Sequence, residues 1–177
     1  MKVIESKTEG KAPGRLSEDN LVITPEFIAV IDGATPKSDF TYEGKSTGRL
    51  AAELVGQVVE EMGADEDCRM FVRRCNEKFR DFYKKIKFPY DIREKGLQAA
   101  AIIYSDHFRE IWMIGDCQAL VDRVEYQQPK KSDVILSQFR SLMMALGAEA
   151  GDARAQIEPW ILKATAFANK AGNSYGY

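Results

Sequence analysis

The sequence predicts an α+β protein in which antiparallel sheets are covered by helices on the outside. Two segments show apolar runs on either side of a turn, two amphipathic helical patterns lie between them, and two more helical patterns follow. Because hairpins and helix pairs occupy separate parts of the chain, strands are expected to pair with their neighbours in sequence. With 177 residues, 45% of them apolar, the chain can bury one core, and we expect a single domain over residues 1–177.

The first β-hairpin is predicted over residues 20–31. Apolar runs at 21–23 and 27–31 flank Thr24-Pro25-Glu26, where the proline favours a turn. Since both runs are almost continuously apolar, both faces of these strands are expected to be covered.

Two amphipathic helices are predicted next, over residues 46–62 and about 65–87. Apolar residues recur in both at spacings of three and four, and Ser46 or Thr47 can cap the first helix. Acidic residues open the second helix and lysines close it, which complements the helix dipole.

The rest of the chain predicts a second hairpin, a short strand and two helices. The expected ranges are 97–104 and 110–114 for the hairpin, 118–123 for the strand, and about 133–146 and 155–170 for the helices. Residues 172–177 read as a turn that leads into an aromatic strand.

Charge and composition argue against several classes of protein. The 25 basic and 27 acidic residues give a net charge of −2, which does not favour nucleic acid or an anionic membrane as a partner. The chain shows no signal-peptide pattern and no run long enough to span a bilayer, so a cytoplasmic location is expected. Three scattered cysteines favour reduced thiols and argue against structural zinc. The single histidine, His107, lies in a predicted turn and gives little support to a Ser-His-Asp mechanism.

Acidic residues lie at the open end of the first hairpin. Glu18 and Asp19 come just before its first strand, and Asp32-Gly33 follows its second strand directly. A hairpin brings these two positions together, so three carboxylates are expected at one end of a sheet. Such oxygen donors suit Mg²⁺ or Mn²⁺, and a two-metal site can hold a phosphoryl group without a protein nucleophile. Taken singly, each cluster also fits a turn or a solvated loop.

Four segments occur in a distinctive order: residues 15–20 (Arg-Leu-Ser-Glu-Asp-Asn), 27–33 (Phe-Ile-Ala-Val-Ile-Asp-Gly), 99–103 and 114–119 (Ile-Gly-Asp-Cys-Gln-Ala). This order resembles that of the metal-dependent serine/threonine protein phosphatases of type 2C, from about Gly14 to Leu120 and more loosely to the final tyrosines. The resemblance implies a two-layer antiparallel β-sandwich flanked by helix pairs. In that family, further strands and two more acidic motifs follow, so the chain is expected to match the N-terminal two-thirds of the domain, with an incomplete metal shell.

The resemblance also implies roles for individual residues. Asp32 would bridge two Mn²⁺ or Mg²⁺ ions, and Glu18 and the Gly33 carbonyl would bind metal directly or through water. Asp19 would support these ligands, and Asp116 would lie near the metals. Arg15 would hold the substrate phosphate, while a metal-activated water would attack a phosphoserine or phosphothreonine of a protein substrate.

Two other functions remain open. One is a non-catalytic regulatory or binding module that keeps the phosphatase-like fold. The other is a phosphatase of the haloacid-dehalogenase type, since residues 31–35 faintly resemble its nucleophile loop. That loop requires an aspartate where Val30 stands, and that fold alternates strands and helices. If strands are missing, unpaired sheet edges would also allow a homodimer.

Overall fold

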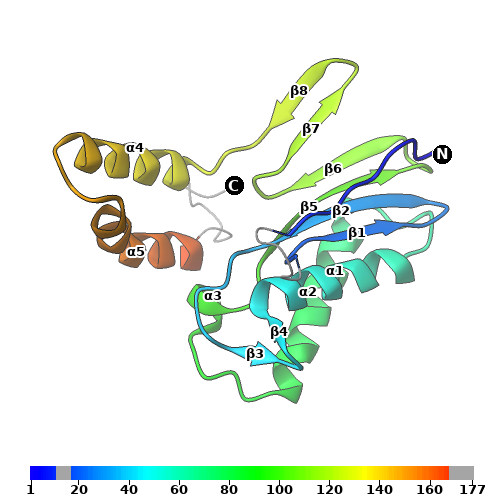
Figure 1. Ribbon diagram of the computed structural model, residues 1–177. Coiled ribbons are helices and arrows are strands. Elements are labelled where there is room, and N and C mark those ends of the chain that lie inside the picture. Colours follow the sequence, from blue (N-terminus) through cyan, green and yellow to red (C-terminus); the bar gives the residue numbers. More distant parts are fainter. Residues whose placement is uncertain (11–16, 168–177) are drawn as a thin grey trace.

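The computed structural model describes residues 1–10 and 17–167, and an antiparallel sheet of four strands lies at its centre (Figure 1). The strand order is β1-β2-β5-β6. The strands are β1 (Asn20–Ile23), β2 (Phe27–Gly33), β5 (Ala99–Ser105) and β6 (Glu110–Ile114). Both predicted hairpins are present, and the pairing of β2 with β5 joins them into one sheet.

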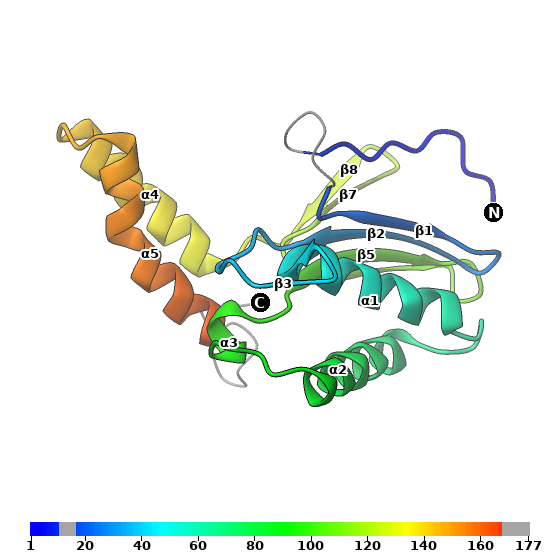
Figure 2. The ribbon, with the colours of Figure 1, turned by 60° about the horizontal axis from the view of Figure 1, so that its bottom comes forward.

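Two helices, α1 (Thr47–Glu61) and α2 (Cys68–Lys85), pack below the sheet (Figure 2). Ser46 caps α1, because its hydroxyl accepts a hydrogen bond from the Arg49 backbone, as the sequence predicts. The second helix starts three residues later than expected. Asp67 is its N-cap, and its carboxylate accepts a hydrogen bond from the Met70 backbone, so the acidic residues precede the helix.

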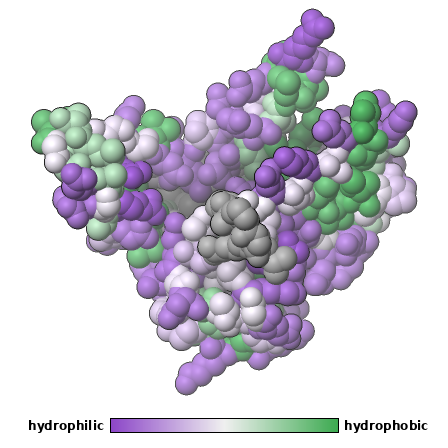
Figure 3. All heavy atoms as spheres, viewed as in Figure 1, coloured by the Kyte–Doolittle hydropathy of each residue, from purple (hydrophilic) through white to green (hydrophobic). Residues whose placement is uncertain are grey.

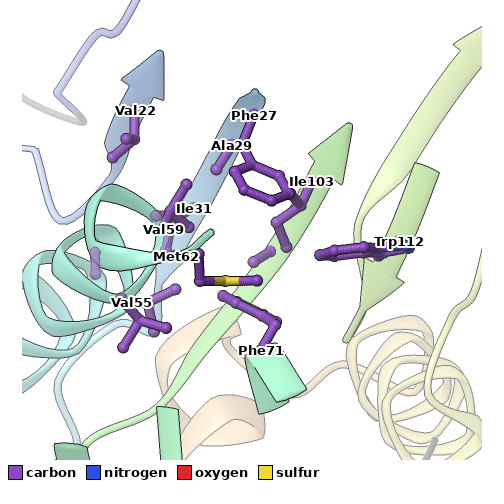
Figure 4. Close-up of a cluster of buried hydrophobic side chains, with 13 residues drawn as sticks. Val22, Phe27, Ala29, Ile31, Val55, Val59, Met62, Phe71, Ile103 and Trp112 are labelled. Atoms are coloured by element: carbon purple, nitrogen blue, oxygen red, sulfur yellow. The ribbon is translucent and has the colours of Figure 1, made fainter. Parts of the chain in front are cut away.

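The main hydrophobic core lies between the sheet and these helices (Figure 4). Phe27 and Ile103 of the sheet and Val58 of α1 are each at most 1% exposed. Trp112 closes one side of the core, with its ring centroid 5.8 Å from that of Phe27 and 6.4 Å from that of Phe71. Burial of these large side chains is the main force that holds α1 and α2 to the sheet.

The opposite face of the sheet is partly open. In β2, Ala29 and Ile31 are fully buried, whereas Val30 between them is 56% exposed. The expectation that both faces are covered is therefore wrong for β2 in the described part of the chain. Alternation of side chains across the strand explains the pattern, because α1 covers only the face that Ala29 and Ile31 share.

Two small hairpins and a short helix extend the structure: β3 (Thr41–Tyr42) with β4 (Lys45–Ser46), β7 (Gln118–Val121) with β8 (Val124–Gln127), and α3 (Ile92–Lys95). The single strand expected over residues 118–123 is in fact half of the β7–β8 hairpin. Its turn is formed by Asp122 and Arg123, which both have positive φ angles, of 49° and 69°. Paired positive φ angles are typical of a two-residue hairpin turn.

Helices α4 (Lys131–Ala145) and α5 (Ala150–Phe167) contact each other and extend away from the sheet (Figure 1). The helix expected over about 155–170 starts earlier in the structure, at Ala150, and Pro159 lies inside it. Apolar residues are exposed on α4, on β7–β8 and on the open sheet face (Figure 3). On α4 they include Ile135, Phe139, Leu142 and Met144.

The architecture is thus α+β with antiparallel sheets, of four, two and two strands in the described residues. The finer expectation, two stacked sheets between helix pairs, remains a proposal. The aromatic strand expected at residues 172–177 lies outside the described residues. None of the helices in the described ranges is long and apolar enough to cross a membrane.

Candidate functional site

The acidic residues predicted from the sequence lie at one end of the central sheet. Antiparallel pairing sets Asn20 of β1 opposite Ile31 of β2. Asp19, just before Asn20, therefore lies beside Asp32, just after Ile31. On the other side of β2, Asp32 pairs with Ala100, and Ala101 pairs with Ile114, two residues before Asp116. The strand register therefore brings these carboxylates to the same end of the sheet; the first hairpin predicts this for Asp19 and Asp32, and the family resemblance implies it for Asp116.

Glu18 and Gly33 are in direct contact with the first turn of α1. A Cβ atom on Gly33 would lie 2.3 Å from the Gly48 carbonyl oxygen and 2.5 Å from that of Glu18. A Cβ atom on Gly48 would lie 2.2 Å from the Ala34 carbonyl oxygen. Only glycine fits at either position, and the close approach keeps Glu18 buried, with 7% of its surface exposed.

Arg49 fixes the loop that carries Glu18 and Asp19. Its Nη1 donates hydrogen bonds to the carbonyl oxygens of Ser17, at 3.3 Å, and of Asp19, at 2.7 Å. Its Nε donates to Glu53 at 2.8 Å. Burial raises the pKa of Glu53, but hydrogen bonds from Lys45 and Arg49 outweigh this effect and lower it overall. Arg49 is not predicted from the sequence, because its role depends on a contact between residues 30 or more positions apart.

Asp116 follows β6 and pairs with Lys130, which follows the β7–β8 hairpin. The Lys130 Nζ lies 3.6 Å from Asp116 Oδ2 and 3.9 Å from Asp133 Oδ2. Burial, together with the negative charges of Asp116 and Asp32, raises the pKa of the Cys117 thiol to about 11. Both carboxylates thus act on the same thiol. Lys130 is not predicted from the sequence, because the segment around it has the composition of an ordinary polar loop.

Two depressions meet at Asp32. The first, called here the acidic hollow, has a volume of about 360 Å³, and its charged lining residues are Lys7, Glu9, Asp19 and Asp32. The second, called the basic cleft, has a volume of about 720 Å³, and its charged lining residues are Asp32, Lys37, Arg93, Asp116 and Lys130. Acidic groups outnumber basic ones in the hollow, and basic groups outnumber acidic ones in the cleft. Asp32 lines both.

The carboxylates suit a divalent metal in kind. They are oxygen donors, which Mg²⁺ and Mn²⁺ prefer. They do not suit it in number: within the described ranges, no group of three or more His, Cys, Asp or Glu side chains is arranged to hold a metal ion. Arg15, the expected phosphate ligand, lies outside the described residues. The cysteines Cys68, Cys75 and Cys117 are free thiols, and His107 is exposed in the turn between β5 and β6.

Comparisons with known proteins identify no relative. No protein-family model matches the chain, and no curated protein or solved structure does either. Function must therefore be inferred from the residues of the hollow and the cleft.

Proposed function

We propose that this protein is a metal-dependent phosphatase that hydrolyses phosphoserine or phosphothreonine in proteins. The observation that carries the proposal is the position of Asp32 between an acidic hollow and a basic cleft. Hydrolysis of a phosphate monoester needs a cation near the attacked phosphorus and positive groups around the phosphoryl oxygens. Asp32 borders one depression that suits a cation and another that suits an anion.

The residues that would hold Mn²⁺ or Mg²⁺ are those at the open end of the first hairpin. They are Glu18, Asp19, Asp32, the carbonyl of Gly33, and Asp116. When bound, the metal would supply an activated water. The contact of Gly33 with Gly48 and the Arg49 hydrogen bonds keep the loop that carries Glu18 close to β2. Arg15 would bind the substrate phosphate, as the resemblance implies.

Hydrolysis of a phosphoserine peptide and of an aryl phosphate with Mn²⁺ tests the proposal. We expect turnover that EDTA abolishes and that Asp32→Ala reduces by about 100-fold or more, because loss of one charge-stabilising group typically costs 10²–10³ in rate. Asp152→Asn is a matched control, because Asp152 is exposed at the start of α5. Wild-type turnover no higher than that of Asp32→Ala would refute the enzyme.

A second candidate is a non-catalytic module that binds phosphoproteins. The ion pair of Lys130 with Asp116 favours it, because this carboxylate already has a cationic partner. Saturable binding of a phosphopeptide without hydrolysis at any Mn²⁺ concentration would select this candidate over the enzyme.

A homodimer is also proposed, through the outer edges of the central sheet. The strands β1 and β6 lie at these edges, where backbone groups can pair with another strand. Sedimentation velocity tests it, and a single monomeric species at all protein concentrations would rule it out.

A further inference from the structure

We propose that the basic cleft is a phosphate-binding site in which Lys37 and Lys130 hold the phosphoryl group of a phosphate monoester. This inference rests on the proposed function for the identity of the anion, but binding itself requires neither a metal nor hydrolysis. The cleft is lined by residues from the end of the sheet, from α3 and from the end of α5. Figure 2 shows α3 beside the end of α5. Its volume of about 720 Å³ is within the usual range for small-ligand sites.

Lys37 is the central residue of this proposal. It lies in the loop after β2 and lines the cleft with Thr35 and Asp32. Within the described residues its ammonium group forms no ion pair, since its nearest charged neighbours act only at longer range. These neighbours are Glu158 and Arg154 on α5, and Asp133 and Lys130 at the start of α4. Lys37 can therefore bind an added anion without giving up a carboxylate partner.

The electrostatics of Lys37 agree with an anion site. Burial lowers the pKa of Lys37, which means that its charged form has lost solvent without a full replacement. Nearby Lys130 and Arg154 lower it further, whereas Glu158 and Asp133 act in the opposite direction. A phosphate dianion would supply the missing stabilisation, because hydrogen bonds between charged groups are the strong ones.

Lys130 has a second role in this arrangement. Its ammonium group already lies 3.6 Å from Asp116, so it links the cleft to the carboxylates at the end of the sheet. A phosphoryl group held between Lys37 and Lys130 would be next to Asp32 and Asp116, since all four line the same cleft. Arg93 also lines it, but its guanidinium is bound to Asp91 at 2.8 Å, so its contribution is smaller.

Calorimetric titration of phenyl phosphate and inorganic phosphate in EDTA tests this site. We expect saturable binding by the wild-type protein and an affinity about tenfold lower for Lys37→Gln, because a hydrogen bond between charged groups is lost. Lys37→Arg should retain most of the affinity. Lys131→Gln is the matched control, because Lys131 is exposed and does not line the cleft. Lys130→Gln should also weaken binding, because it removes the second ammonium group proposed to hold the anion.

Two results would overturn the inference: no saturable binding by the wild-type protein, or an equal loss for Lys37→Gln and Lys131→Gln. The test is separable from that of the proposed function. Phosphate binding that depends on Lys37, without Mn²⁺-dependent turnover, would refute the phosphatase and keep the site. Turnover with a KM that Lys37→Gln leaves unchanged would keep the phosphatase and refute the site.

Discussion

Replacement of Gly33 by alanine tests whether close packing holds the acidic loop against the end of β2. The added Cβ atom would lie 2.3 Å from the Gly48 carbonyl oxygen and 2.5 Å from the Glu18 carbonyl oxygen. Both neighbours are backbone atoms, so no side chain can rotate away to make room. The change is small, yet it affects three segments at once: β2, the start of α1 and the loop before β1.

The magnitude follows from the overlap. Ordinary contact begins at 3.4 Å, so β2 and α1 would have to separate by about 1.1 Å, the difference between 3.4 and 2.3 Å. Overpacking of this kind costs about 1–3 kcal/mol, and we expect the upper end because the backbone must move. A loss of about 3 kcal/mol is roughly a 150-fold change in the folding equilibrium, at about 1.4 kcal/mol per tenfold. In a protein of this size it lowers Tm by about 6–12 °C.

Urea and thermal denaturation, followed by circular dichroism, measure this loss. Gly151→Ala is the matched control, because a Cβ atom at Gly151 would meet no heavy atom within 4 Å. Gly151 lies in α5, where alanine is the better helix former, so this variant should be unchanged or more stable by about 0.5–1 kcal/mol.

Close packing at Gly33 is refuted if Gly33→Ala unfolds at the same urea concentration and temperature as the wild type. It is also refuted if Gly151→Ala loses as much stability, because the effect would then reflect an added methyl group anywhere in the chain. A drop in the slope m for Gly33→Ala alone would indicate that the native state is already loosened around the acidic loop.

Three further predictions concern the core, the loop before β1 and the thiols. Ile103→Ala should lower the free energy of unfolding by about 2–5 kcal/mol, because Ile103 is fully buried. Val30→Ala, on the open face, should lower it by less than about 1 kcal/mol, and urea titration compares the two variants. Arg49→Met should lower the free energy of unfolding by about 1–2 kcal/mol, because two hydrogen bonds to the carbonyl oxygens of Ser17 and Asp19 are lost. The loop before β1 should then be cleaved faster by a protease, and resistance equal to that of the wild type would contradict this. Burial raises the pKa of Cys75 to about 12 and that of Cys117 to about 11, from 9.0, so at pH 8 a thiol reagent should react with them slowly until the protein unfolds. Since the unfolded thiols ionise first, stability should fall as the pH rises above 9, and a flat profile up to pH 11 would contradict the burial of these thiols.

Local patterns in the sequence identified most of the fold. The hairpins around Pro25 and His107, the helix capped by Ser46 and the long amphipathic helix after it are all present. The errors occur where local signals conflict. The helix α5, which contains Pro159, starts earlier than the sequence indicates, and a turn at Asp122 divides what reads as one strand.

The site was only partly predictable, for a similar reason. Asp19 and Asp32 could be brought together from the sequence because one short hairpin joins them. Lys37 and Lys130 could not, since they come from separate loops that meet only where α4 and α5 pack near the end of the sheet. No regular spacing in the sequence marks such a contact.

The sequence by itself determined the strands of the central sheet, the long helices and the acidic end of the first hairpin, because hydrophobic period, caps and turns act over a few residues. Only the tertiary structure decided that Val30 stays exposed, that Gly33 meets Gly48, and that a basic cleft borders Asp32. These features depend on which surfaces pack together, and packing joins residues that lie far apart along the chain.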